Sequence, residues 1–345
     1  MKIGIVNDTP LAVEALRRTL AARRDYEVLW VAQDGEQAVD FCSAQRPDIV
    51  LMDLVMPNVD GIEATRRIMA RAPCAILIVT VDVGANAWRV YEAMGAGALD
   101  AVDTPSLNGP DAPRSIATLI AKIDRIAALV KERNAPGAAP AITPAGATNR
   151  DTPLVAIGAS AGGPAALATL LAGLPKDFAA ATVIVQHVDA AFAAGMADWL
   201  NQQSALPVRI AREGDRPQAG VVLLAATDDH LHLKLPNVLG YTRVPEETPY
   251  RPSVDVFFHS VVARWPACAV GVLLTGMGRD GAIGLKAMRA KGYHTIAQDQ
   301  ATCAVYGMPK AAAALGAAVA ILPLPRIAAA VVAAIGPRQT DAGRL

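Results

Sequence analysis

The sequence predicts an α/β protein built from two doubly wound domains, each with a mainly parallel sheet. Short apolar runs alternate with helical patterns of several turns in both halves of the chain, and such alternation favours a parallel sheet covered by helices. Between the halves, residues 134–153 are crowded with Ala, Pro, Gly and Thr and show no apolar periodicity, which is typical of a linker. A chain of 345 residues with 53% hydrophobic residues can bury two cores.

The first half carries signals for five strands and for the helices between them. Thr9 before Pro10, and Asp60 three residues before Glu63, are patterns of helix starts. Five strands joined by helices suit the flavodoxin-like order 2-1-3-4-5, in which the carboxyl ends of strands one and three meet at a ligand-binding switch point. The expected strands are 3–6, 28–31, 49–52, 75–79 and 98–102.

The second half has the same character. His230, His232 and Lys234 alternate with leucines, which predicts a hairpin that leaves the main sheet. Helical patterns fill most of the longer gaps between the apolar runs. The expected strands are 154–159, 182–186, 208–211, 221–225 and 269–275.

Composition excludes several classes of protein. Lys and Arg together number 32, and Asp and Glu together also number 32. No basic surface for nucleic acid or anionic lipid is therefore expected. Residues 1–6 lack a signal-peptide pattern, and the alanine-rich stretch 311–335 is interrupted by Pro323, Pro325 and Arg326. We therefore expect a cytoplasmic protein without direct membrane insertion. The spacing of the cysteines favours buried free thiols over disulfides or zinc: Cys42, Cys74, Cys268 and Cys303.

The most informative run is Gly158 to Gly163, which places Ser160 at a sharp turn between an apolar strand and a helix. This arrangement fits the G-x-S-x-G elbow that presents a nucleophile. Two other interpretations remain open from the run alone. It is also compatible with a simple strand-to-helix turn, or with a turn that binds phosphate at the helix N-terminus.

A serine nucleophile needs a base and an acid that orients the base. His187 ends the run TVIVQH, and Asp280 follows the run AVGVLLTG, so both belong at strand ends beside Ser160. The chain order Ser, His, Asp differs from that of α/β-hydrolases. Alternatively, His187 makes a local hydrogen bond and Asp280 is a turn or N-cap residue.

A second cluster, Asp228, Asp229, His230 and His232, raises the alternative of a metal site. The two histidines share a strand face, but no third dispersed ligand stands out. No cofactor is therefore expected in the second half.

In the first half, Asp8 and Asp53 follow strands one and three, so the topology brings their carboxylates together. Two carboxylates and a backbone carbonyl suit Mg²⁺, which leaves Asp53 able to attack a phosphoryl group. Thr80, at the end of strand four, is a candidate to bind a phosphoryl oxygen. Strand-end solvation is the alternative explanation for the two carboxylates.

The runs VNDTP, LMDLVMPNVDG, IVT and GALDAVDTP resemble a response-regulator receiver domain over residues 1–120. That resemblance implies that Asp53 is the phosphoacceptor and that Asp8, Asp53 and the Val55 carbonyl hold Mg²⁺.

Two residues depart from the receiver pattern. Asn7 stands where most receivers have a second acidic residue, and Thr104 stands where most have a lysine before Pro105. That lysine normally pairs with the phosphoryl group, and a charge-assisted contact of this kind contributes about 1.5–3 kcal/mol. We therefore expect that phosphorylation of Asp53, or the response to it, is weaker than in most receivers or depends on different residues.

The runs GASAGGPAAL, VIVQH, YRPSVDVFF and LLTGMGRDGAIGL resemble the catalytic domain of CheB-type chemotaxis protein-glutamate methylesterases. The resemblance implies a catalytic domain over 154–338, preceded by a helix end and linker over 121–153. It also implies a triad of Ser160, His187 and Asp280. The other residues it implicates are Ala161 and Met277, whose backbone N–H groups would form an oxyanion hole, and Arg251, Ser253 and Asp255, which would support the site.

By this resemblance the activity is hydrolysis of glutamate γ-methyl esters on chemoreceptor helices, with release of methanol, together with glutamine deamidation. The implied partners are a methylated receptor and a chemotaxis-type histidine kinase. The VNDTP and VDTP variants look most like the Wsp-type surface-sensing branch.

Two other functions remain as alternatives. A phosphorylation-regulated module that binds phosphate or a nucleotide without hydrolysis is one, although no P-loop lysine follows the glycines. A serine esterase for small soluble esters is the other.

Overall fold

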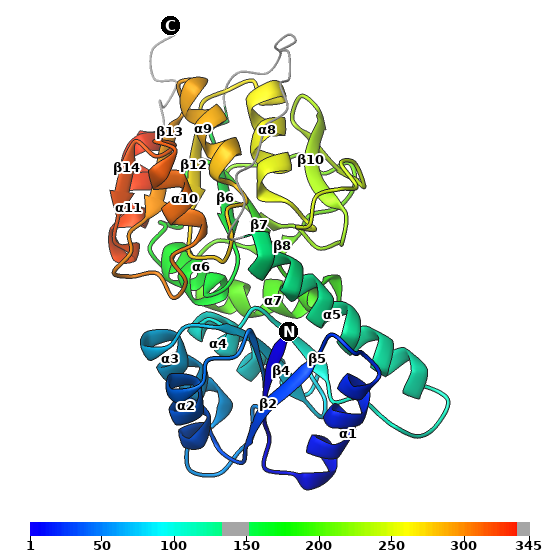
Figure 1. Ribbon diagram of the computed structural model, residues 1–345. Coiled ribbons are helices and arrows are strands. Elements are labelled where there is room, and N and C mark those ends of the chain that lie inside the picture. The colour runs from blue at the N-terminus through cyan, green and yellow to red at the C-terminus, as the bar shows by residue number, and fades with distance from the viewer. Residues whose placement is uncertain (133–151, 337–345) are drawn as a thin grey trace, which may run out of the picture. The chain divides into compact units, whose positions relative to one another are not determined.

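The computed structural model describes residues 1–132 and 152–336. These residues form two compact units, one around a five-stranded sheet and one around a seven-stranded sheet (Figure 1). The predicted linker 134–153 lies outside the described residues except for its last two positions, and the predicted domain end at 338 lies outside them as well.

The first unit is an alternating βα structure whose five strands are all parallel. Its sheet order is β2-β1-β3-β4-β5, which confirms the predicted flavodoxin-like topology. The elements are β1 (Lys2–Val6), α1 (Pro10–Ala21), β2 (Glu27–Ala32), α2 (Gly35–Ala44), β3 (Ile49–Met52), α3 (Gly61–Arg71), β4 (Ala75–Thr80), α4 (Ala87–Ala96), β5 (Asp100–Asp103) and α5 (Ala112–Glu132).

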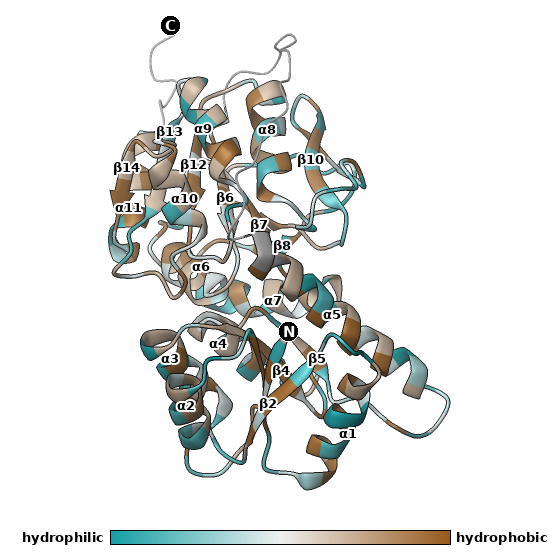
Figure 2. Ribbon diagram, in the orientation of Figure 1, coloured by the Kyte–Doolittle hydropathy of each residue, from teal (hydrophilic) through white to brown (hydrophobic). Residues whose placement is uncertain are grey.

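Local signals explain the helix starts of this unit. The Asp60 carboxylate accepts a hydrogen bond from the Glu63 N–H at 2.9 Å and so caps α3 as predicted. Thr9 occupies the N-cap position of α1, but its hydroxyl donates to Asp8 at 3.3 Å instead of capping the helix. Figure 2 shows brown and teal segments along α1 and α2, as expected for helices with one face on the sheet.

The register of β1 and β3 determines which side chains meet at the sheet edge. Val6 pairs with Met52, and the Asp53 N–H continues the ladder by donating to the Val6 carbonyl at 2.9 Å. The residues that follow these strands, Asn7 and Asp53, therefore emerge side by side.

The second unit has the sheet order β14-β13-β12-β6-β7-β9-β8, with a separate β10-β11 hairpin. Every described pairing within the larger sheet is parallel, and the predicted hairpin is confirmed. The elements are β6 (Leu154–Ala159), α6 (Gly163–Ala172), β7 (Ala181–Gln186), α7 (Ala190–Gln203), β8 (Val208–Ile210), β9 (Val222–Leu224), β10 (His230–Leu235), β11 (Val238–Thr242), α8 (Val254–Arg264), β12 (Ala269–Leu273), α9 (Ala282–Ala290), β13 (His294–Gln298), α10 (Met308–Ala314), β14 (Ala320–Leu322) and α11 (Leu324–Ile335).

The sequence pattern missed β13 and β14. The run of β13 contains Thr295 and Gln298, which are polar but buried. Each has a partner that lies far away in the sequence: Thr295 Oγ1 donates to the Ala317 carbonyl at 2.8 Å, and Gln298 Oε1 accepts from the Thr275 N–H at 2.9 Å. Hydropathy cannot detect a strand whose polar side chains are satisfied by tertiary contacts.

Helix α8 packs very closely on the sheet of the second unit. A Cβ added to Gly158 would lie 2.2 Å from Val254 Cγ1, and one added to Gly281 would lie 2.7 Å from the same atom. Gly281 also has a φ of 82°, a conformation that favours glycine. These two glycines thus allow the first turn of α8 to pack against the ends of β6 and β12.

All four cysteines are free, but only Cys42 and Cys74 are buried; Cys268 is exposed and Cys303 is half-buried, so the expectation of burial was wrong for the latter two. Cys268 lies just before β12, where the chain is still at the surface.

Within residues 1–132 and 152–336, no helix is long and apolar enough to cross a membrane.

We predict that Gly158→Ala lowers the free energy of unfolding by about 1–3 kcal/mol, because the added methyl overlaps Val254 in a close-packed core. Urea denaturation would measure the change. The control is Gly84→Ala, whose Cβ would meet only the Asp82 carboxylate at 3.2 Å among the described residues. Equal midpoints for both variants would contradict the prediction.

Candidate functional site

Three neighbouring strands of the second unit carry the predicted triad at their carboxyl ends. β6 lies between β12 and β7, with Gly158 paired to Leu273 on one side and to Val185 on the other. Ser160 follows β6, His187 follows β7, and Asp280 lies in the loop between β12 and α9. The His187 N–H also donates to the Ala159 carbonyl at 3.0 Å. Parallel topology therefore brings all three residues to one sheet edge.

The backbone at Ser160 turns sharply. Gly162 has a φ of 79°, and the Gly163 N–H donates to the Ser160 carbonyl at 2.7 Å. A positive φ is readily adopted only by glycine. The predicted strand-to-helix elbow is therefore present in the backbone, with α6 beginning at Gly163.

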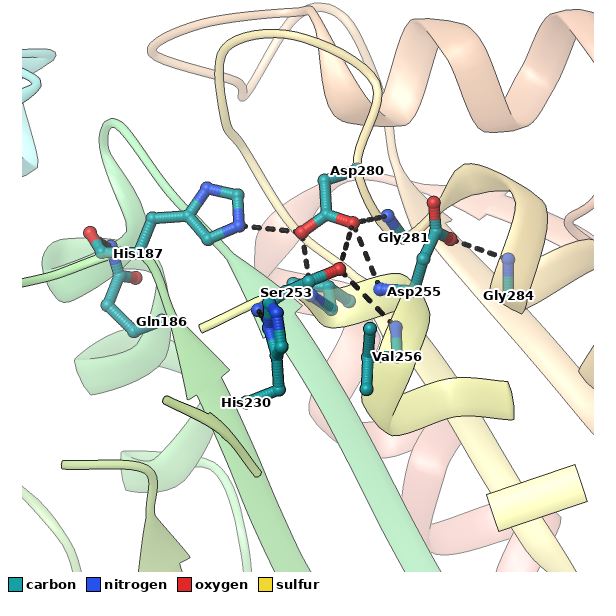
Figure 3. A network of polar contacts seen from close by, with 10 residues as sticks. Gln186, His187, His230, Ser253, Asp255, Val256, Asp280, Gly281 and Gly284 are labelled. Atoms are coloured by element: carbon teal, nitrogen blue, oxygen red, sulfur yellow. Dashed lines mark hydrogen bonds and ion pairs between the residues drawn. The ribbon is translucent and has the colours of Figure 1, made fainter. Parts of the chain in front are cut away.

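The Asp280 carboxylate is buried and accepts hydrogen bonds on both oxygens. Oδ2 accepts from His187 Nε2 at 2.8 Å and from the Val254 N–H at 2.6 Å. Oδ1 accepts from the Ser253 hydroxyl at 2.9 Å and from the N–H groups of Asp255 and Gly281, each at 3.0 Å (Figure 3). Most of these donors belong to the N-terminus of α8, which favours negative charge.

These contacts determine the charge of Asp280. Burial by itself raises the pKa of Asp280, but hydrogen bonding and charge from His187, together with backbone N–H groups, bring the pKa below its ordinary value. The carboxylate is therefore ionised at neutral pH and able to orient the His187 ring.

His187 is held from three directions. Its Nε2 donates to the ionised Asp280, so Nδ1 is the ring nitrogen that remains to accept a proton. The Tyr250 ring stacks on the imidazole with centroids 4.9 Å apart and an interplanar angle of 20°. The Gln186 amide donates to the His187 carbonyl at 3.1 Å and holds the strand end.

Ser253 and His230 support the acid. Ser253 is the N-cap of α8, and its hydroxyl, while donating to Asp280, accepts from the Val256 N–H at 3.3 Å. His230 is fully buried: its Nδ1 accepts from the Ser253 N–H and its Nε2 donates to the Pro245 carbonyl, both at 3.1 Å. Burial lowers the pKa of His230, which keeps the ring neutral.

The contacts of His230 also bear on the alternative metal site. Both of its ring nitrogens are used within the protein, and the described residues contain no group of three or more His, Cys, Asp or Glu that could hold a metal ion. Sequence reasoning missed the contribution of His230, and also that of Tyr250, because no local pattern links either residue to Asp280 or His187.

Asp255 lies next to Asp280, and its pKa is shifted in the opposite direction. Burial, followed by the charge of Asp280, raises the pKa of Asp255 well above its ordinary 3.8. Its Oδ1 accepts from the Gly284 N–H at 2.6 Å and so joins α8 to α9. Arg251 lies in the preceding loop and donates to the Glu246 carbonyl at 2.8 Å.

The two predicted oxyanion-hole residues also follow strands of the same sheet. Ala161 comes next after Ser160, and Met277 lies in the loop after β12. Their backbone roles remain predictions.

In the first unit, Asp53 is buried at the end of β3 and receives three donors. Asn7 Nδ2 donates to Oδ2 at 3.0 Å, and the N–H groups of Leu54 and Val55 donate to Oδ1 at 2.7 and 3.5 Å. Burial raises the pKa of Asp53 to about 6, and the charge of Asp8 contributes to the increase. Thr80 ends β4 and accepts a hydrogen bond from Asn86 Nδ2 at 3.5 Å.

The first-unit residues fit a hard divalent cation. The two carboxylates of Asp8 and Asp53 repel each other electrostatically, and a cation would relieve that repulsion. With the Val55 carbonyl they would supply an all-oxygen donor set of the kind that Mg²⁺ prefers, completed by water. Asn7 contributes an N–H donor to Asp53 instead of a third negative charge.

Comparisons with known proteins identify both units. Residues 155–331 match the CheB methylesterase family, and residues 3–109 match the response regulator receiver domain. The chain belongs to the CheB methylesterase family.

Individual relatives agree with this assignment. A protein-glutamate methylesterase/protein-glutamine glutaminase of Burkholderia thailandensis is 70% identical over 95% of this chain and 96% of its own length. One of Burkholderia orbicola is 66% identical over 99% of this chain and 100% of its own. The crystal structure of the Thermotoga maritima CheB methylesterase catalytic domain is 34% identical, with a TM-score of 0.51, and covers 54% of this chain and 99% of that one. The resemblance to the Wsp-type branch stays a prediction.

We predict that Asp255→Asn raises the free energy of unfolding and that the gain grows as pH rises from about 4 towards neutrality. In the unfolded chain Asp255 ionises near its ordinary pKa, whereas the folded chain retains the proton. The wild-type protein therefore binds more protons folded than unfolded across this window, and its stability falls with rising pH; the amide removes that loss.

Urea denaturation at a series of pH values would measure this effect. Asp198→Asn, at an exposed position of α7, is the matched control. If the difference between Asp255→Asn and wild type is the same at every pH, the folded chain does not hold Asp255 protonated.

Proposed function

We propose that this chain is a protein-glutamate methylesterase and protein-glutamine glutaminase regulated by phosphorylation of its own receiver domain. The observation that carries the proposal is the buried, ionised Asp280 paired with His187, on strands that flank the one preceding Ser160. The family and its named relatives support the substrate class. We assign the receiver to 1–120, the helix end and linker to 121–153, and the catalytic domain to 154–338.

Acylation begins at Ser160. His187 Nδ1 takes the hydroxyl proton as Ser160 Oγ attacks the carbonyl carbon of the glutamyl methyl ester. The negative charge moves to the carbonyl oxygen, where the N–H groups of Ala161 and Met277 donate to it; each strong donor of this kind contributes about 2.7–4 kcal/mol. Asp280 stabilises the imidazolium formed at His187. The carbon–oxygen bond to the methoxy group then breaks, and that group leaves as methanol with the proton from His187.

Deacylation repeats these steps with water. His187 takes a proton from water, the hydroxide attacks the acyl-enzyme, and the bond to Ser160 Oγ breaks as that oxygen regains a proton. The product is a glutamate carboxylate. With a glutamine side chain as substrate, ammonia leaves in place of methanol.

Regulation occurs at Asp53. A carboxylate oxygen of Asp53 attacks the phosphorus of a phosphohistidine on the kinase, a P–O bond forms, and the P–N bond breaks. Asp8, Asp53 and the Val55 carbonyl would hold Mg²⁺, which when bound supplies positive charge to the phosphoryl oxygens. The Thr80 hydroxyl donates to one of those oxygens.

The proposed partners follow from this chemistry. The substrate is the cytoplasmic helical region of a methylated chemoreceptor, and the phosphoryl donor is a chemotaxis-type histidine kinase. We therefore place the protein in the cytoplasm. Balanced charge, with 32 basic and 32 acidic residues, gives no support for a nucleic-acid partner.

Ser160→Ala should abolish methanol release from a methylated receptor, and Asp280→Asn should lower the rate by about 10⁴-fold because it loses the charge that orients and stabilises His187. Mass spectrometry of the receptor, with and without the protein, would follow loss of methyl groups. Methanol release by Ser160→Ala at the wild-type rate would rule out the mechanism. Hydrolysis of p-nitrophenyl acetate without action on the receptor would indicate an esterase for small esters instead.

Acetyl phosphate with Mg²⁺ should change the methylesterase rate of the wild-type protein but not that of Asp53→Asn, which lacks the attacking carboxylate. EDTA should abolish this response and leave the basal rate unchanged, since the proposed hydrolysis uses no metal ion. Methanol release measured with each addition would check both results. An unaltered response in Asp53→Asn would exclude Asp53 as the regulatory site.

A further inference from the structure

The phosphoryl site of the receiver lacks the lysine common in related domains. Thr104 occupies that position, and its N–H donates to the Thr80 carbonyl at 2.8 Å. A phosphoryl group brings additional negative charge and three strong acceptor oxygens. Thr104 can offer only a neutral hydroxyl to that charge, so a cation from another element would be needed to replace the lysine.

Two polar side chains of α4 contact residues of the neighbouring loops and strand ends. Asn86, its N-cap residue, donates to the Thr80 hydroxyl. Arg89 lies three residues later and therefore on the same face of the helix. Its Nη2 donates to Asp60 Oδ2 at 3.1 Å.

Asp60 is in turn close to Asp53 because α3 begins against the backbone of the β3 end. The Gly61 N–H donates to the Leu54 carbonyl at 3.2 Å. A Cβ at Gly61 would lie only 2.0 Å from the Asp53 carbonyl oxygen. The ion pair with Asp60 therefore joins Arg89 to the residue just before Gly61, whose backbone lies against that of Asp53.

Two further observations concern the donors of Arg89 and its electrostatic effect on Asp53. The side chain is 25% exposed, and within the described part of the chain its buried Nε has no hydrogen-bond partner. The charge of Arg89 also lowers the pKa of Asp53, against the larger effect of burial, so the two groups lie within electrostatic reach.

We propose that Arg89 binds the phosphoryl group on Asp53 and takes the place of the missing lysine, exchanging its contact with Asp60 for one with the phosphoryl oxygens. This inference rests on the proposed role of Asp53 as phosphoacceptor. Guanidinium is well suited to the task because it offers several N–H donors in a planar array that matches phosphate oxygens. Since Arg89 belongs to α4, its movement would couple that helix to phosphorylation.

A purely structural role is the competing explanation, in which Arg89 and Asp60 only join α4 to α3. Asp60→Asn separates the two explanations. Asparagine is as good an N-cap as aspartate, so α3 is retained, while Arg89 loses its paired charge. A structural role predicts that Asp60→Asn and Arg89→Gln behave alike, whereas phosphoryl binding predicts opposite effects.

The experiment uses the full chain with Mg²⁺ and beryllium trifluoride, which mimics a phosphoryl group on aspartate. Isothermal calorimetry would measure its affinity, and phosphate-affinity gels would measure the phosphoprotein formed from acetyl phosphate; in that reaction Asp53 gains the phosphoryl group as a P–O bond breaks and acetate leaves. The variants are Arg89→Gln, Arg89→Gln with Thr104→Lys, Asp60→Asn and Asp53→Asn. The control is Arg66→Gln, at an exposed arginine of α3 paired with Glu63.

Arg89→Gln should weaken beryllium trifluoride binding about tenfold or more, as expected for loss of a charge-assisted contact. Thr104→Lys in the same chain should restore the affinity, Asp60→Asn should leave it equal or increase it, and Arg66→Gln should not change it. Circular dichroism of each variant without beryllium trifluoride would verify that the fold is retained.

Wild-type affinity in Arg89→Gln, or parallel losses in Arg89→Gln and Asp60→Asn, would overturn the proposal for Arg89 while Asp53 remains the acceptor. If Asp53→Asn binds beryllium trifluoride and accepts phosphate as well as the wild type does, the role of Asp53 fails, and the inference about Arg89 fails with it.

Discussion

The catalytic unit depends on keeping one charged carboxylate, that of Asp280, inside the protein. Burial of an ionised carboxylate is strongly unfavourable unless hydrogen bonds replace its hydration. Here His187, the Ser253 hydroxyl and three backbone N–H groups provide them. Because most of these donors lie at the start of α8, that helix must approach the sheet closely. The ionised state of Asp280 therefore depends on the close packing of α8 against the sheet.

Other residues of this unit follow from that requirement. Gly158 and Gly281 leave room for Val254 at the first turn of α8. His230 holds Ser253 through its backbone N–H, and burial beside Asp280 raises the pKa of Asp255, which disfavours a second negative charge there. Tyr250 then determines the plane of the His187 ring from the loop that leads into the helix. A base oriented in this way needs little reorganisation during catalysis.

The buried carboxylate of the receiver, Asp53, lies in a different environment from that of Asp280. Asp53 accepts fewer hydrogen bonds than Asp280 and lies near the charge of Asp8. The effect of burial is therefore not offset, and the pKa of Asp53 is raised. A carboxylate in this state gains more from an added cation than Asp280 would, which is consistent with the proposed binding of Mg²⁺ and a phosphoryl group at Asp53. Asn7 donates a hydrogen bond to Asp53, and the charge of Arg89 lowers the pKa of Asp53.

The sequence by itself determined the topology of the receiver, the β6, β7 and β12 strands and the placement of Ser160, His187 and Asp280. Apolar periodicity identifies strands, and parallel strands bring their carboxyl ends to one edge. Only the tertiary structure decided that His230 and Tyr250 support the site, that the pKa of Asp255 is raised, that β13 and β14 extend the sheet, and that Arg89 pairs with Asp60. Each of these depends on partners distant in the chain, whose pairing leaves no periodic signal in the sequence.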